Sequence, residues 1–117
     1  MRSVLVITRQ PPGRHAAREA LDVVLAAAAF GVPVGLLFMD EGVLQLLKGQ
    51  DASQLKQKSL AANLQALELF GVEEVMVCSH SLAERRLGIG QCALNAKSVS
   101  PSDIALLLEH YDQVVSL

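Results

Sequence analysis

The chain has 117 residues, of which 51% are hydrophobic and only 19% charged, and its formal net charge is −2. This length suits one domain built around one hydrophobic core. The weakly acidic balance argues against a nucleic-acid-binding module, because phosphate binding needs a basic surface. Typical globular chains carry about 25% charged residues, so the shortage of charge indicates that another chain covers part of the surface.

Two features of the sequence indicate a cytoplasmic protein. Its two cysteines form no dense framework, which fits a reducing compartment. The first apolar run, residues 4–7, is too short for the core of a signal peptide or for a membrane span. We therefore expect a cytoplasmic protein that makes no membrane contact.

The first third of the chain has the pattern strand, helix, strand. Residues 4–7 are a continuous apolar run of mostly β-branched residues, typical of a strand buried on both faces. A helix is expected over residues 15–30, closed by Gly31. Its second half, residues 23–30, is apolar all round and should be buried both by the sheet and by a partner. A second buried strand is expected over residues 32–39.

The middle of the chain holds a leucine-rich loop and a second long helix. Residues 40–50 are expected to form a loop with a short helical turn. Its leucines are Leu44, Leu46 and Leu47. They either pack at a subunit interface or fill the protein's own core. Capping-box spacing and leucines at helical intervals predict a helix over residues 52–70, which Gly71 ends.

The last third repeats the pattern of strands and helices. We expect a strand over residues 72–78, a short capped helix over 81–87 and a weaker strand over 92–99. Proline at the first helical position predicts a helix that begins at Pro101. The buried stripe expected for this helix is Ile104, Leu107, Leu108 and Tyr111. A last short strand is expected over residues 113–117.

Alternating strands and helices predict an α/β fold. The expected architecture is a flavodoxin-like parallel five-stranded sheet with helices on both faces, in a single domain. The strand order expected for such a sheet is 2-1-3-4-5. No linker or low-complexity segment divides the chain.

Ligands of such sheets bind beyond the carboxyl ends of the strands, so the candidate loops include residues 8–14 and 39–50. In the first loop, Pro11 and Pro12 remove two N–H donors from the place where a phosphate would need them. The chain has no Trp and one Tyr, which leaves little aromatic surface for a flavin. The two cysteines stand fourteen positions apart without a paired histidine. We expect no cofactor and no metal, and a structural role for Cys92.

Cys78 is the candidate catalytic residue. It follows an apolar run at the expected end of the third strand and precedes Ser81, the expected start of a helix. A helix N-terminus and the neighbouring His80, Arg85 and Arg86 would favour the thiolate, which is the nucleophilic form. Free cysteine is also among the most buried residue types. The residues therefore leave two interpretations open, a reactive thiol and a packed apolar side chain.

Four segments carry a resemblance to a known family. They are "AREALDVVLAAAAFG" (17–31), "FMDEGVLQLLKGQ" (38–50), "VCSHSLAERRLG" (77–88) and "YDQVVSL" (111–117). On these segments, in this order, the sequence resembles the TusC/DsrF family of sulfur-relay subunits. The resemblance covers nearly the whole chain. It implies one DsrE/DsrF-like domain over residues 1–117, with a flavodoxin-like fold that holds no flavin.

The resemblance also implies partners and a pathway. TusC-like proteins assemble with TusB-like and TusD-like subunits as a dimer of heterotrimers, a heterohexamer that passes persulfide sulfur toward 2-thiouridine at the tRNA wobble position. In this family the relaying cysteine is assigned to the TusD-like subunit, where it lies in a strand-to-helix turn similar to the one around Cys78. The resemblance thus implies mainly an assembly subunit, and at most a sulfurtransferase subunit, with no direct nucleic-acid binding expected.

Three functions remain open at this point. The first is the assembly subunit, and the second is a persulfide carrier that acts through Cys78. The third is a small flavodoxin-like ligand-binding domain, with its pocket between residues 8–14 and 39–50. The sequence also leaves open whether the pathway serves tRNA thiolation or sulfur oxidation.

Overall fold

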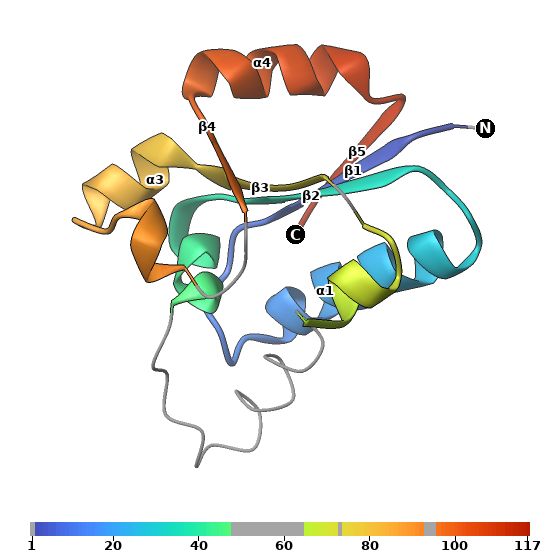
Figure 1. Cartoon of the computed structure of the whole chain (residues 1–117), viewed down its shortest axis with the longest axis horizontal. Coiled ribbons are helices and arrows are strands. Elements are labelled where there is room, and N and C mark those ends of the chain that lie inside the picture. Colours follow the sequence, from blue (N-terminus) through green and yellow to red (C-terminus); the bar gives the residue numbers. More distant parts are fainter. Residues whose placement is uncertain (1, 48–64, 73, 93–95) are drawn as a thin grey trace.

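A computed structural model describes residues 2–47, 65–72, 74–92 and 96–117 of the chain. Most of the helix expected over residues 52–70 therefore lies outside the described residues. Its described end, residues 65–69, is helical, as expected. The chain folds as a sheet with helices on both of its faces (Figure 1).

The sheet has five strands, and every neighbouring pair is parallel. The strands are β1 (Val4–Thr8), β2 (Val34–Phe38), β3 (Glu74–Cys78), β4 (Lys97–Val99) and β5 (Gln113–Ser116). The three inner strands, β1, β2 and β3, come from the apolar runs of the sequence, because only such runs suit a strand covered on both faces. The expected parallel α/β fold is confirmed.

The order of the strands is β4-β3-β2-β1-β5, so the expected order 2-1-3-4-5 is wrong. β2 pairs with both β1 and β3, and the chain therefore steps in one direction through its first four strands. It reverses only at the last crossover, which returns β5 to the free side of β1. The apolar runs of β1, β2 and β3 are too alike for the sequence to rank them by position.

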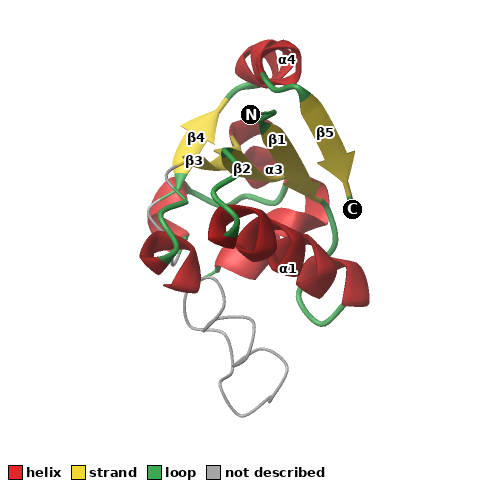
Figure 2. Cartoon of the chain, turned by 90° about the vertical axis from the view of Figure 1, so that its right-hand side faces the viewer, coloured by secondary structure: helices red, strands yellow, loops and turns green. Residues whose placement is uncertain are grey.

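This strand order explains how the helices divide between the two faces. Crossovers between parallel strands are right-handed, so steps in one direction place their helices on one face, and a reversed step uses the other face. Helices α1 (His15–Ala29) and α3 (Ser79–Glu84) belong to forward steps, and α4 (Pro101–His110) to the reversed one. In Figure 2, α4 and α1 lie on opposite sides of the sheet.

Two apolar cores result, one on each face of the sheet. On the α1 face, Leu21 and Val24 pack against side chains of the inner strands, including Phe38. On the α4 face, Ile104 and Tyr111 pack against the alternate side chains of the same strands. Alternate residues along each strand thus belong to opposite cores, because successive side chains of a strand point to opposite faces of the sheet.

Helix α4 confirms its expected start and corrects its expected stripe. Ser100 and Asp103 form a capping box, with Pro101 in the first turn. Ile104 and Tyr111 are buried. Leu108 is 43% exposed, so its place in the buried stripe was wrong. Among the described residues α4 is the one helix on this face of the sheet, and its ten residues make a narrow contact that leaves Leu108 at the side of the helix.

The apolar second half of α1 is buried on one side only. The sheet side takes Leu21 and Val24, whereas Val23 and Ala26 face outward and Phe30, the residue that caps the helix, is 85% exposed. The sheet thus buries only one side of this half-helix. Burial of the other side by a partner stays a prediction. In the part of the chain that is described, no helix has the length and apolar character needed to cross a bilayer.

Candidate functional site at the carboxyl edge of the sheet

Buried polar side chains gather at the carboxyl ends of the inner strands. Within the described residues, the buried polar side chains are Thr8, Gln45 and Ser81. Thr8 ends β1, Gln45 lies in the 3-10 helix η1 (Asp40–Leu46) that follows β2, and Ser81 lies in α3 after β3. A buried polar group is costly unless it is hydrogen-bonded, so their bonds define how this edge is built.

Gln45 joins η1 to the first loop by hydrogen bonds. Its side-chain Nε2 donates to Thr8 Oγ1 at 2.9 Å and to the carbonyl of Gln10 at 2.8 Å. Gly42 also lies directly against the Thr8 carbonyl, where a Cβ atom would overlap the oxygen. Residues 8–10 and η1 are therefore in direct contact. The ligand-binding interpretation had expected a pocket between these two segments.

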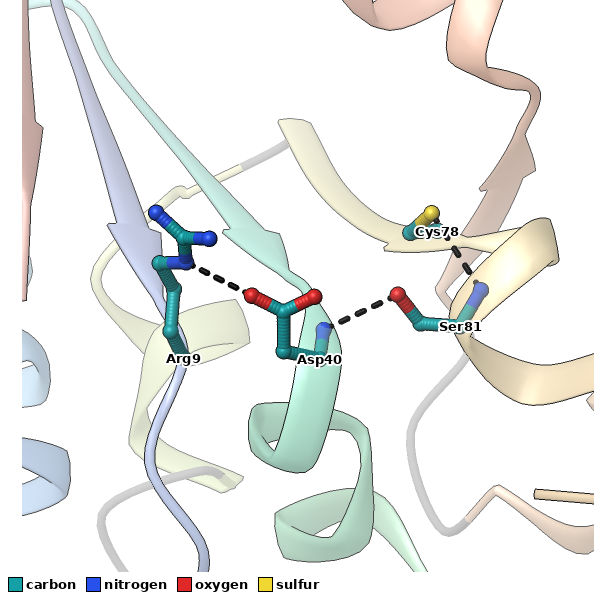
Figure 3. Close-up of polar contacts among 4 residues, drawn as sticks. All are labelled: Arg9, Asp40, Cys78 and Ser81. Atoms are coloured by element: carbon teal, nitrogen blue, oxygen red, sulfur yellow. Dashed lines mark hydrogen bonds and ion pairs between the residues drawn. The ribbon is translucent and has the colours of Figure 1, made fainter. Parts of the chain in front are cut away.

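Asp40 joins β1 to α3. Its carboxylate accepts a hydrogen bond from Arg9 Nε at 2.7 Å, and its own backbone N–H donates to Ser81 Oγ at 2.9 Å (Figure 3). Asp40 has a φ of 51°, the left-handed conformation that costs most residues about 1 kcal/mol or more. Asp tolerates this conformation better than most residues, and the two bonds hold the turn in place.

Cys78 lies at the end of this chain of contacts. Its Sγ accepts a hydrogen bond from the N–H of Ser81 at 3.4 Å, so the cysteine itself is the N-cap of α3 (Figure 3). The helix spans Ser79–Glu84, and the start expected at Ser81 was therefore wrong. A sulfur cap is hard to foresee, because Ser, Thr, Asp and Asn are the residues that usually take this role.

The Cys78 side chain is buried and only 3% exposed. It belongs to the apolar core on the α4 face, with Met76, Val99 and Ile104. Cys92, also buried, belongs to the core on the α1 face. The sheet separates the two thiols, and Cys78 presents its sulfur to apolar side chains and one N–H group.

Of the three side chains expected to favour the Cys78 thiolate, His80 and Arg85 make their described contacts elsewhere. His80 is exposed and its Nε2 lies 3.5 Å from Glu84 Oε1, one turn along α3. Arg85 Nη1 donates to the Ser81 carbonyl at 3.0 Å. Arg86 is exposed and has a φ of 56°, just after the end of the helix. The printed bonds thus hold His80 and Arg85 along α3.

Of these residues, only Cys78 was predicted from the sequence as a site residue, whereas Asp40, Thr8 and Gln45 were missed. One signal for Gln45 was present, a lone amide flanked by leucines in a short helical turn. Leu46 is fully buried in the protein's own core, as one of the two interpretations of these leucines expects. Leu44 and Leu47 are half-buried, and an interface over them stays a prediction. Residues 48–50 lie outside the described part of the chain.

The fold and this edge can now be set beside known proteins. The model of the DsrE/DsrF-like family matches residues 1–117. The chain belongs to the DsrE/DsrF-like family. It is 47% identical over 116 residues to a protein of Pseudomonas aeruginosa named "Protein TusC homolog", and the match covers 98% of each chain. Proteins of the same name from Vibrio parahaemolyticus and Pasteurella multocida are 35% and 30% identical, over 91% and 99% of this chain and 90% and 99% of their own.

Solved structures share the family fold at low sequence identity. The crystal structure of the ychN protein from E. coli superposes with a TM-score of 0.84 at 17% identity, over all of both chains. The structure of MTH1491 from Methanobacterium thermoautotrophicum superposes with a TM-score of 0.68 at 13% identity, also over all of both chains. These likenesses support the fold of the whole chain.

Proposed function

We propose that this DsrE/DsrF-like protein is a subunit of a heteromeric sulfur-relay complex, in which it mainly supports the assembly. The observation that carries the proposal is the match to TusC homologs, 47% identical over 98% of the chain in the first case. The expected partners are TusB-like and TusD-like subunits in a dimer of heterotrimers. The expected product of the relay is 2-thiouridine at the tRNA wobble position, in the cytoplasm.

The burial of Cys78 favours the role of an assembly subunit over that of a sulfur carrier. A sulfur carrier must present its thiolate to a persulfide on another protein, which requires access as well as stabilisation. The thiol of Cys78 is 3% exposed, and its Sγ accepts the N–H bond that caps α3. Reaction at Cys78 would therefore need the α4 side of the sheet to open.

The second candidate function is a persulfide carrier, and the position of Cys78 favours it. The residue ends a central strand at the N-terminus of a helix, beside the hydrogen-bonded groups of Asp40 and Ser81. In that mechanism the Cys78 thiolate attacks the terminal sulfur of a donor persulfide. The S–S bond breaks, its electron pair leaves on the donor as a thiolate, and Cys78 becomes the persulfide.

Replacement of Cys78 by Ser in the assembled complex distinguishes the two functions. The complex of this chain with its TusB-like and TusD-like partners receives radiolabelled persulfide sulfur, and label in tRNA 2-thiouridine is counted. We expect Cys78→Ser to transfer sulfur within about twofold of the wild type, the same as the Cys92→Ser control, because neither buried thiol carries the sulfur.

Two results would contradict the proposal in different ways. Transfer abolished by Cys78→Ser, with the complex intact by native mass spectrometry, would establish Cys78 as a carrier. Failure of the wild-type chain to form any complex with TusB-like and TusD-like subunits would remove the assembly role itself.

A further inference from the structure

A cavity lies at the edge of the sheet opposite Cys78, where the strands begin. Its volume is about 370 Å³, in the range of small-molecule sites. It lies at the end of the molecule that carries the N label in Figure 1. The end of α1, the segment Phe70–Val72 and the end of α4 form its walls. It shares no residue with the Cys78 edge, and the sulfur-relay role does not account for it.

Two helix carboxyl ends with the same sequence line this cavity. They are Phe30-Gly31-Val32 at the end of α1 and Phe70-Gly71-Val72 at the end of the helical segment 65–69. In both, the glycine has a positive φ, 77° and 78°, and its N–H donates to the carbonyl three residues back at 3.0 Å. Helix carboxyl ends carry partial negative charge, so both ends favour a cation in the space between them.

A carboxylate stands in the same cavity. The Tyr111 hydroxyl donates a hydrogen bond to Glu74 Oε2. Burial, and then the Glu74 carboxylate, raise the pKa of Tyr111, so this hydroxyl keeps its proton and stays a donor. A carboxylate offers about four acceptor positions, and one bond from Tyr111 leaves capacity for a further donor. Gly35 makes room for this pair, because a Cβ atom there would overlap the Tyr111 hydroxyl.

Charges of both signs lie near the cavity. Ser3 lines it and donates its N–H to Asp112 Oδ2 at 2.8 Å. The bonds from Ser3, and then the charges of Arg2 and of the N-terminal amino group, lower the pKa of the Asp112 carboxyl. The His110 ring stands edge-on to the Tyr111 ring, with 5.5 Å between their centroids. Phe70, which is 49% exposed, adds an aromatic wall of the kind that attracts cations.

We propose that this cavity binds a cationic group, an alkylammonium or a guanidinium, between the two helix ends and the Glu74 carboxylate. The cation donates hydrogen bonds to Glu74 and lies against apolar walls that include Val34 and Val72. Two sources can supply such a group, a free small amine or a Lys or Arg side chain of a partner subunit. The chemistry of recognition is the same for both.

Titration of the ¹⁵N-labelled chain tests the binding with matched probes. Guanidinium and ethylammonium chlorides are added at millimolar concentration, with urea and ethanol as neutral counterparts of the same shape. We expect saturable shifts of the Gly31 and Gly71 amides with the two cations only.

Glu74→Gln keeps an acceptor for Tyr111 and should weaken cation binding by at least about tenfold. Glu109→Gln, an exposed α4 carboxylate outside the cavity lining, is the control.

Repeating the titration on the assembled complex distinguishes the two sources. If a partner's basic side chain fills the cavity, guanidinium no longer binds the complex, and Glu74→Gln lowers the affinity of the chain for its partner. If the ligand is a free amine, the complex binds guanidinium as the isolated chain does. Equal shifts with urea, unchanged binding in Glu74→Gln or no saturable shift in the isolated chain would each overturn the proposal. None of these outcomes depends on sulfur transfer.

Discussion

Single residues decide the chemistry at the carboxyl edge. Cys78 was identified from the sequence because a thiol at the end of a buried strand is conspicuous. Its burial was beyond the sequence, because it depends on how α4, which begins more than twenty residues later, packs on the sheet. Its bond to the Ser81 N–H is local, but cysteine is an unusual N-cap. Asp40 was missed because its partners Arg9 and Ser81 come from two other segments of the chain.

The burial of both cysteines leads to a prediction about their reactivity. Cys78 and Cys92 are 3% and 4% exposed, so a reagent reaches either thiol only when the fold opens locally. We expect iodoacetamide to modify both thiols of the native chain more than about tenfold more slowly than in denaturant. Mass spectrometry of peptides after timed quenching measures each rate. A native Cys78 that reacts as fast as the denatured one would show an accessible thiol and would favour the carrier function.

At the scale of elements, the sequence predicted the inner strands and the helices α1 and α4 well and the order of the strands in the sheet poorly. Apolar runs mark β1, β2 and β3 because burial on both faces admits little else, and glycine at positions 31 and 71 marks helix ends because the conformation requires it. Strand order depends instead on which crossover reverses, and no local pattern encodes that choice.

The capping box of α4 gives a prediction at this scale. Asp103 N–H donates to Ser100 Oγ at 3.2 Å, and Ser100 N–H donates to Asp103 Oδ2 at 3.0 Å. Ser100→Ala removes the first bond and should destabilise the protein by about 1 kcal/mol, as loss of an N-cap usually does. Ser102→Ala, an exposed serine of the same turn, is the control. Urea unfolding of both variants measures the difference, and equal stability of the two would contradict the role of the cap.

The same box makes the stability of α4 depend on pH. The backbone and side-chain bonds from Ser100 lower the pKa of the Asp103 carboxyl. A group whose pKa is lower in the folded state stabilises the fold above its unfolded value, about 3.9 for Asp. That contribution is lost as the pH falls through the lowered value. The advantage of the wild type over Asp103→Asn, which removes the titrating carboxyl, should therefore be full near neutral pH and shrink below about pH 4.

At the scale of the whole molecule, the shortage of charge and the outward face of α1 point to a partner. Val23, Ala26 and Phe30 recur at positions i, i+3 and i+7, which places them on one side of the helix, away from the sheet. Val23 is 39% exposed and Phe30 is 85% exposed. The sequence indicated an apolar half-helix, but only the structure shows which residues of it face outward. Ala27 and Ala28, two further residues of this half-helix, are half-buried.

Ala26→Asp tests whether a partner covers this face. Because Ala26 is exposed in the isolated chain, a carboxylate there meets water and should lower the melting temperature by no more than the modest helix propensity of Asp requires. At an apolar interface the same carboxylate would be buried without a partner, which costs several kcal/mol. We expect Ala26→Asp to weaken binding to the TusB-like and TusD-like subunits by more than about tenfold.

Ala105→Asp places the same charge at an exposed position of α4 and is the control. Native mass spectrometry of the complex and thermal unfolding of the isolated chain give the two measurements. If Ala26→Asp binds its partners as Ala105→Asp does, the α1 face lies open in the complex and the assembly uses another surface.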